Sequence, residues 1–298
     1  MSISTEKLID YFSISNATNL NGQNVLHYIV TTGCIGLTHY QCNKLIKYFI
    51  NKGCDINLQD NLGRTPIHVA VEEENVNELD ILLTNGADPN ILDNEGKTVF
   101  EHSWQRLGKG THTSFKIQSY RYLACYLNKM QVAGCWISER NRHIYRISLN
   151  AYNYYCHSNL EVHSKELHKM SKIYLNHQIN LKSFLEKKEN EISLLINSEI
   201  LEKVLKNVDH EFPIFGCVLK LQYTKGFANK KLSNNAHIAL EKMINFKLPV
   251  LCFENIRIYL DQTDLKNMIN SIKELQKKYS NCTLKEFSQV CKMVIQSF

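Results

Sequence analysis

The sequence predicts an all-α protein, in which a short solenoid of helical repeats is followed by a helical C-terminal domain. Two pairs of glycines share one interval of 33 residues, since Gly86 follows Gly53 (86 − 53) and Gly96 follows Gly63 (96 − 63). Between these glycines, apolar residues recur every three or four positions, as they do along one face of a helix. The chain's prolines stand where elements are expected to start or stop, at positions 66, 89, 213 and 249.

Residues 60–92 form the unit that displays this period best. Thr65 is a good N-cap, and Pro66 suits the first helical position, where its missing N–H costs nothing. We therefore expect a helix over residues 66–73. Gly86 is placed to end a second helix in the left-handed conformation. The apolar stripe of that second helix is formed by Leu79, Leu82 and Leu83.

This unit resembles an ankyrin repeat, a family of 33-residue helix–turn–helix units that open with a T-P-L-H-like run. The resemblance implies an arm that stacks several such units, because one unit cannot bury its apolar faces alone. It is carried by Gly63, Thr65, Pro66, Ile67, His68, Ala70, Leu82, Leu83, Gly86, Ala87, Asp88 and Asn90.

Flanking repeats are expected on both sides of this unit. The first occupies about residues 19–59 and exceeds the period by eight, as the 41 residues from Gly22 to Gly63 indicate, with the excess looped out near residues 31–41. The third opens at residue 93 and has a delayed second helix near residues 120–127. A helix over residues 5–12 is expected to cover the first repeat. Residues 1–130 are thus predicted to hold about three ankyrin repeats, the third degenerate.

The third repeat is expected to start its first helix by different chemistry. Glu101 replaces the His of the T-P-L-H run, and Thr98 with Glu101 fits a capping box.

The ankyrin resemblance implies that a target protein binds the loop tips and first helices of the arm. Leu62 is the apolar residue at a tip that should be wet, which motivates the choice of this surface. The predicted partner-binding residues are Asn61, Leu62, Arg64, Asp93, Asn94 and Lys97.

Residues 131–159 are rich in Arg and Tyr and are predicted to form a basic, aromatic linker containing a half-exposed helix. A basic and aromatic ligand-binding patch is the alternative for this stretch. From residue 160 the repeat period is lost, and residues 160–298 are predicted to form a second, helical domain. Helices are expected over residues 161–174, 181–208, 218–228 and 236–246.

Residues 248–269 read L-P-V-L-C-F-E-N-I-R-I-Y-L-D-Q-T-D-L-K-N-M-I and predict a helical hairpin. The first helix starts at Pro249 and carries an apolar face, and a second starts at Asp264. Periodicity alone favours a hairpin that is buried in the domain core. The residues of interest are Leu248, Pro249, Phe253, Ile256, Leu260, Asp264 and Leu265.

The spacing of this hairpin resembles the opening of an F-box, from Leu-Pro to Asp-Leu. Leu251 stands where that family usually has Glu, and the later Val-Cys-x-x-Trp part is missing in register. A truncated F-box behind ankyrin repeats is similar to the PRANC family of poxviruses and parasitoid wasps. That resemblance covers roughly residues 160–272, and it implies docking of the seven hairpin residues on the Skp-type linker of an SCF ubiquitin ligase.

Charge divides the chain into two parts. The net charge is +6, but residues 1–100 hold 6 Lys and Arg and 12 Asp and Glu, which leaves 29 and 17 for the remainder. An acidic arm and a basic remainder indicate two modules with different partners. Nucleic-acid binding is not expected, because no DNA- or RNA-binding motif accompanies the basic charge. No apolar run approaches the roughly 18–20 residues of a membrane helix.

The residue patterns provide no catalytic site. P-loop, G-x-S-x-G and H-E-x-x-H runs do not occur, and no His or Cys set has zinc spacing. We therefore expect no enzyme activity, cofactor or metal. The ten cysteines are scattered without a C-x-x-C, which favours reduced thiols in an intracellular protein of the cytoplasm, with the nucleus as the alternative.

Two functions of different classes follow from these resemblances. One is an adaptor, whose repeats capture a target while the F-box-like end recruits the ligase, in control of host immune signalling. The alternative is a stoichiometric inhibitor, similar to the ankyrin inhibitors of NF-κB, which sequesters its partner without a ligase.

Overall fold

The computed structural model describes residues 18–32, 38–108, 114–152, 160–244, 265–267 and 269–270. These residues are helical, with two isolated antiparallel bridges, Leu92 with Thr98 and Tyr174 with Asn180. They divide into two compact units, one within Met1–Glu186 and Lys203–Leu221, the other within Lys187–Glu202 and Gln222–Phe298. The all-α class expected from the sequence is therefore confirmed for the described chain.

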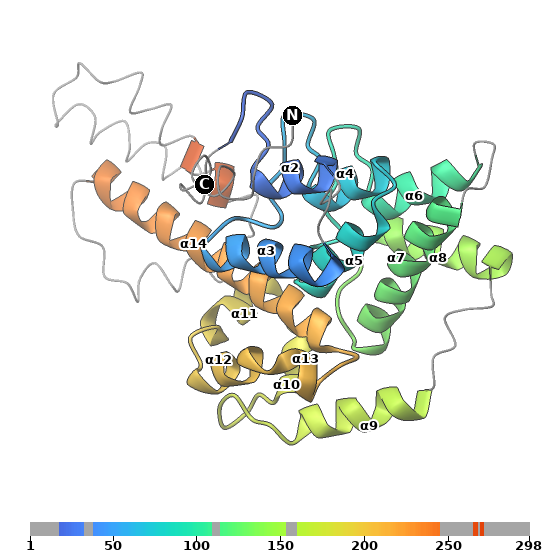
Figure 1. Ribbon diagram of the computed structural model, residues 1–298. Helices are drawn as coiled ribbons and strands as arrows, with labels where there is room; N and C mark the ends of the chain where they lie inside the picture. Colours follow the sequence, from blue (N-terminus) through green and yellow to red (C-terminus); the bar gives the residue numbers. More distant parts are fainter. Residues whose placement is uncertain are drawn as a thin grey trace, which may run out of the picture. The chain divides into compact units, whose positions relative to one another are not determined.

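The first part of the chain alternates short first helices with longer second helices (Figure 1). The first helices pack in one row, α2 on α4, α4 on α6 and α6 on α8, and the second helices in another, α3 on α5 and α5 on α7. The helices are α2 (Val25–Thr32), α3 (His39–Asn51), α4 (Pro66–Glu72), α5 (Val76–Thr84), α6 (Val99–Gly108), α7 (Ser114–Val132) and α8 (Glu139–Tyr152).

Each second helix ends by the same chemistry, which the glycine period had indicated for Gly53 and Gly86 but not for Gly134. Gly53, Gly86 and Gly134 have φ of +88°, +94° and +75°, the left-handed region that an L side chain resists. In each case the next amide donates to a carbonyl five residues back, as Ala87 does to Leu82 at 3.0 Å. This bond closes the helix and turns the chain into the following repeat.

The core of the repeat stack consists of apolar side chains at helical spacing, as the stripes predicted. Those of α4 and α5 are almost all buried, which places the middle repeat between its two neighbours. Fully buried members include Leu26, Ile46, Ile67, Leu79, Leu82, Phe100 and Leu123.

The segment expected to link two domains contains α8, and this helix is part of the repeat stack. Ser138 accepts the amide of Asn141 at 3.3 Å and so caps α8, and the buried Asn141 reaches back to the preceding repeat. Its Nδ2 donates to the Pro89 carbonyl at 2.9 Å, and its Oδ1 accepts from Thr98 at 2.6 Å. Helix α8 therefore takes the position of a first helix of a fourth repeat, which the sequence did not indicate.

Beyond α8 the helices no longer follow the repeat. They are α9 (Leu160–Ser171), α10 (Leu181–Leu185), α11 (Glu189–Leu195), α12 (Glu199–Lys206), α13 (Val208–Glu211) and α14 (Gly216–Ile244). Two helix predictions were wrong here. Residues 181–208 form separate short helices, and α10 has its own cap, where Asn180 accepts the Ser183 amide at 2.9 Å. Residues 218–246 were expected to break, but α14 runs through to Ile244 because no proline interrupts it.

Helix α9 holds the start of α14 through one buried carboxylate. Glu166 is 9% exposed and accepts the amides of Ile214 and Phe215, the latter at 2.8 Å. Amides ahead of a helix have no partner within that helix, so a carboxylate there satisfies them and complements the helix dipole. The ring of His163 meets Phe215 edge-on beside this contact.

The start of α14 also packs on the repeats. A Cβ added to Gly86 would lie 2.9 Å from the Lys220 backbone carbon, and the Lys220 ammonium donates to the Thr84 carbonyl at 3.1 Å. Lys220 and Lys47 both pair with Asp209. Residues 208–221 thus cover the ends of the second helices α3 and α5.

Several sequence predictions lie outside the described residues. These are the helix over residues 5–12 and the hairpin positions Leu248, Pro249, Phe253, Ile256, Leu260 and Asp264. The expectation that all ten cysteines are reduced was wrong for Cys42, which is disulfide-bonded. None of the described helices is both long and apolar enough to span a membrane.

Candidate functional site

Three turns between repeats share one geometry, and we call them finger one (residues 19–23), finger two (60–64) and finger three (93–97). In each, the first side chain accepts the amides of the third and fifth residues. Asp60 does so at 2.9 Å for both, Asp93 at 2.9 and 2.8 Å, and Asn19 at 2.9 and 3.0 Å. The fourth residue is a glycine with positive φ in all three fingers. Such an Asx turn fixes the finger without help from the repeat core.

Neighbouring fingers are joined by asparagine ladders. Asn61 donates its amide to the Asn21 carbonyl at 2.9 Å and its Nδ2 to the Leu20 carbonyl at 3.0 Å. One repeat later, Asn94 donates in the same way to Leu62 at 3.0 Å and to Asn61 at 2.9 Å. Both asparagines were predicted to bind a partner. In the structure they connect neighbouring fingers, a role that the sequence pattern did not indicate.

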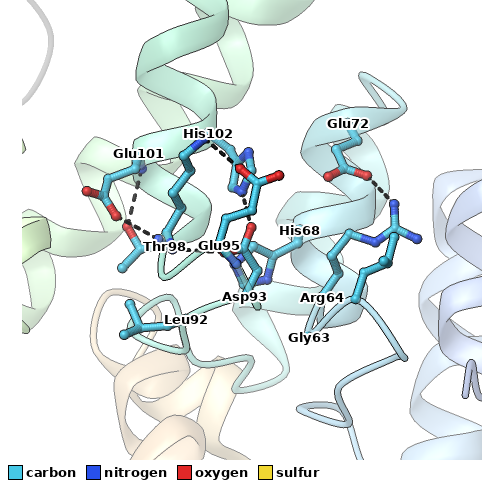
Figure 2. Close-up of polar contacts among 12 residues, drawn as sticks. Gly63, Arg64, His68, Glu72, Leu92, Asp93, Glu95, Thr98, Glu101 and His102 are labelled. Carbon is cyan, nitrogen blue, oxygen red and sulfur yellow. Dashed lines mark hydrogen bonds and ion pairs between the residues drawn. The ribbon is translucent and has the colours of Figure 1, made fainter.

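Arg64 ties finger two to its own helix, as Figure 2 shows. Its guanidinium pairs with Asp60 at 2.8 Å and with Glu72 at 2.6 Å, and its side chain is 24% exposed. Burial alone would raise the pKa of Asp60, but the hydrogen bonds from Arg64 outweigh it and hold that pKa below the ordinary value. Arg64 thus presents only part of its charge to a partner.

Finger three carries its own ion pair and a hydrogen bond to α6. Lys97 pairs with Glu95 at 2.7 Å, and Asp93 accepts from the His102 Nε2 of α6 (Figure 2). Asp93 is 8% exposed, so the predicted binding residue Asp93 forms the base of the finger and is not on its surface. Burial opposes its ionisation, but hydrogen bonds from the Lys97 amide and His102 lower its pKa.

A buried histidine lies under fingers two and three. His68 is fully buried, its Nδ1 lies 2.8 Å from the Thr65 hydroxyl, and its ring meets His102 edge-on. Burial, followed by the charge of His102, lowers the pKa of His68 to about 4. In the first repeat, the Nε2 of His27 lies 3.0 Å from the Arg64 carbonyl, so this histidine connects one finger to the next.

The third repeat replaces this histidine by Glu101. Its carboxylate accepts the Thr98 amide at 2.8 Å, and the Thr98 hydroxyl accepts the Glu101 amide at 3.2 Å. The predicted capping box is therefore present (Figure 2). Arg140 of α8 pairs with the same Glu101 at 3.1 Å and so connects the start of α6 to α8.

Leucines are the most exposed apolar side chains on the fingers. Leu62 at the tip of finger two is 58% exposed, as the sequence indicated, and Leu20 in finger one is 99% exposed. Leu92, directly before finger three, is 42% exposed. Sequence reasoning missed Leu20 and Leu92, although both stand next to the Asn or Asp that starts a finger. An apolar side chain on a wet, rigid turn is suited to insertion into a partner surface.

The described residues include one member of the predicted hairpin site. Leu265 is fully buried, so its side chain contributes to a core and not to the surface of the chain. Among the described residues, no group of three or more His, Cys, Asp and Glu side chains is placed to hold a metal ion.

Comparison with known proteins agrees with the repeat geometry. Residues 4–93 match the sequence model of the family described as ankyrin repeats (3 copies). The chain is 25% identical to the fowlpox virus ankyrin repeat protein FPV219 over 252 residues, which is 78% of this chain and 52% of that protein. It is 24% identical to FPV232 of the same virus over 236 residues, 76% of this chain and 47% of that protein.

A cellular protein matches over a shorter stretch. The ankyrin and IPT/TIG repeat-containing protein C26H5.05 of Schizosaccharomyces pombe is 30% identical over 99 residues, 33% of this chain and 8% of that protein. The chain therefore spans about half the length of the two fowlpox proteins and a small part of the yeast one. It carries ankyrin repeats and is homologous to fowlpox ankyrin repeat proteins, and its repeats provide an architecture for protein–protein interaction.

Proposed function

We propose that this protein is a non-catalytic adaptor, whose fingers capture a target protein and whose C-terminal hairpin recruits an SCF ubiquitin ligase. The observation that carries the first half is the exposed leucines on the rigid fingers, Leu20 on finger one and Leu62 on finger two, with Leu92 exposed directly before finger three. The turns are fixed by Asp and Asn side chains, so a partner would meet an ordered surface and lose little conformational entropy in binding it.

The second half rests on sequence resemblance. The Leu-Pro to Asp-Leu spacing of residues 248–269 is similar to an F-box opening. The alignments with the fowlpox ankyrin proteins, 252 and 236 residues long, extend beyond the repeats, so the similarity includes part of the chain that follows them. An adaptor of this kind does no chemistry, and it raises the effective concentration of the target near the ligase. We place this action in the cytoplasm or nucleus of a host cell, in control of immune signalling.

One experiment tests both halves with paired variants. The tagged chain is recovered from cells and probed for cullin, for the Skp-type linker and for co-purifying target. We expect Leu248→Ala with Pro249→Ala to lose the linker and keep the target, because the changes lie at the start of the predicted hairpin. We expect Leu62→Ala to lose the target and keep the linker.

The outcomes separate the adaptor from the inhibitor. A chain that retains its target but never co-purifies with cullin or the linker would be a stoichiometric inhibitor. Retention of the linker by the Leu248→Ala, Pro249→Ala variant would remove the F-box-like hairpin from the proposal. Tyr48→Ala on α3 is a matched control for Leu62→Ala, because it also removes an exposed side chain from the repeats.

A further inference from the structure

The finger ladder has an open side at finger three. Asn61 donates to two carbonyl oxygens of finger one, and Asn94 donates to two carbonyl oxygens of finger two. The equivalent acceptors of finger three are the carbonyl oxygens of Asn94 and Glu95. Within the part of the chain that the structure describes, no donor contacts either oxygen. Asn94 and Glu95 are both exposed residues.

The surroundings of the finger glycines also distinguish finger three from fingers one and two. A Cβ added to Gly22 would lie 2.6 Å from the Oδ1 of Asn61, and one added to Gly63 would lie 2.5 Å from the Oδ1 of Asn94. Gly96 has the same backbone, with φ of +72°, but among the described residues its Cβ would meet nothing within 4 Å. Finger three therefore has the shape that receives an asparagine, with space beside it.

The space exists because the fourth repeat lacks a finger. A finger lies between the glycine that ends one repeat and the residue that caps the next first helix. This interval is twelve positions from Gly53 to Thr65 (65 − 53) and from Gly86 to Thr98 (98 − 86), but only four from Gly134 to Ser138 (138 − 134). Helix α8 begins directly after Ser138 and covers α6. The helical core is thus covered by α8, whereas none of the described residues covers the end of the finger ladder.

We propose that the open side of finger three, formed by the carbonyl oxygens of Asn94 and Glu95 and the uncovered face of Gly96, binds an asparagine-bearing turn of a partner protein. The partner's asparagine donates its main-chain N–H to the Glu95 oxygen and its side-chain amide to the Asn94 oxygen. Asn94 itself makes these two bonds to finger two. This inference rests on the proposed capture of a protein by the fingers and specifies the chemistry of that contact.

The two neighbouring fingers argue for this occupant, because Asn61 and Asn94 fill the equivalent pair of acceptors there. An ionised aspartate or glutamate side chain has no donor and is excluded. A second copy of this chain does not supply the match, because its free finger one has Leu20 at the asparagine position. A turn is required because the glycine face admits only a close approach of the kind that fingers two and three make.

Nuclear magnetic resonance of the full-length chain tests the site with a defined probe. The probe is a cyclic peptide with the sequence of residues 92–98, L-D-N-E-G-K-T, which carries the asparagine of finger three. We expect saturable shifts of the Glu95 and Gly96 amide signals, because these amides belong to the same peptide groups as the accepting carbonyls of Asn94 and Glu95. A peptide with Ala in place of its asparagine should bind about fivefold more weakly or worse, because it loses one hydrogen bond.

A blocking variant provides the matched control. Gly96→Asn tolerates the positive φ better than other residues and fills the open space, so it should abolish the shifts while the remaining spectrum is kept. Absence of shifts with the asparagine peptide, equal binding of the alanine peptide, or shifts that persist in Gly96→Asn would each overturn the proposal. Concentration-dependent shifts of the same amides without peptide would assign the site to a second copy and also contradict it.

The test is independent of the adaptor proposal. It uses neither target nor ligase, so peptide binding with no target capture in cells would refute the adaptor and leave the site intact. Target capture that depends on Leu62 without peptide binding at finger three would refute only this inference.

Discussion

The middle repeat (residues 60–92) and the third repeat (93–135) use the same turns and glycines in different surroundings. In the middle repeat, Gly63 is covered by Asn94 and Gly86 by the Lys220 backbone. In the third, Gly96 has open space among the described residues, and Gly134 faces the flexible side chain of Glu186. The backbone conformation of a glycine therefore follows from the repeat, whereas the cost of replacing it follows from its neighbours.

The largest expected effect contrasts Gly86→Val with Gly134→Val. Both valines would meet the left-handed backbone, which costs about 1–2 kcal/mol. Gly86→Val adds about 1–3 kcal/mol, because its side chain would run into the Lys220 backbone, which cannot rotate away as Glu186 can. Urea unfolding of both variants measures the difference. Equal losses would mean that residues 208–221 do not pack on this helix end in solution.

Acid should weaken the repeats through the histidine of the middle repeat. The pKa of His68 is about 4 in the folded chain, below the ordinary histidine value of 6.5, so the unfolded state binds more protons between these values. Stability is therefore lost as pH falls through this window, by roughly 3 kcal/mol in total. The measurement is the unfolding free energy at pH 7 and pH 4.

His68→Gln isolates this contribution. Asp60 and Asp93 also have lowered pKa values, so the stability that they contribute is lost as pH falls too. Because both are present in the parent and in the variant, their contribution cancels in the comparison. The variant should show a clearly smaller acid loss than the parent. Identical pH profiles would show that burial of neutral His68 is not the source.

Alanine at the finger glycines should give a smaller contrast. Gly63→Ala and Gly96→Ala share the strain of positive φ, but only the first places a Cβ against the Asn94 backbone. We expect Gly63→Ala to cost about 1–2 kcal/mol more than Gly96→Ala in unfolding free energy. A Gly96→Ala variant that is as damaged as Gly63→Ala would mean that finger three is covered in solution.

The smallest expected effect concerns the finger ion pairs. Arg64→Ala removes partly solvated pairs with Asp60 and Glu72, and screening by water limits the loss to about 1 kcal/mol or less. Lys97→Ala should leave the melting temperature unchanged, because its pair with Glu95 is exposed. A large loss for Arg64→Ala would show that this side chain holds finger two in place.

The sequence predicted those features of the fold that are determined by residues close together in the chain. Thr65, Pro66 and Gly86 act within a few positions, so the start and end of the helices of the middle repeat followed from them. The place of α8 in the repeat stack was not predicted, because Gly134 follows Gly86 by 48 residues (134 − 86), which breaks the period. The cap that Glu166 provides for α14 joins residues almost 50 positions apart, and no local pattern signals such a contact.

The candidate site shows the same division. Leu62 stood out as an apolar residue in a turn, and it is exposed at a fingertip. Asn61, Asn94 and Asp93 looked like free polar groups, yet they fix the fingers, because their partners are backbone atoms that no side-chain pattern records. The hairpin prediction over residues 248–269 stays a prediction.

Site-specific photo-crosslinking tests most directly whether the fingers capture a target. A photoreactive amino acid is placed at Leu62 on finger two or at Tyr48 on α3, two exposed positions of the same repeat stack. We expect one discrete adduct from Leu62 in cells that express the chain, and none of that mass from Tyr48. The same adduct from Tyr48, with none from Leu62, would contradict it.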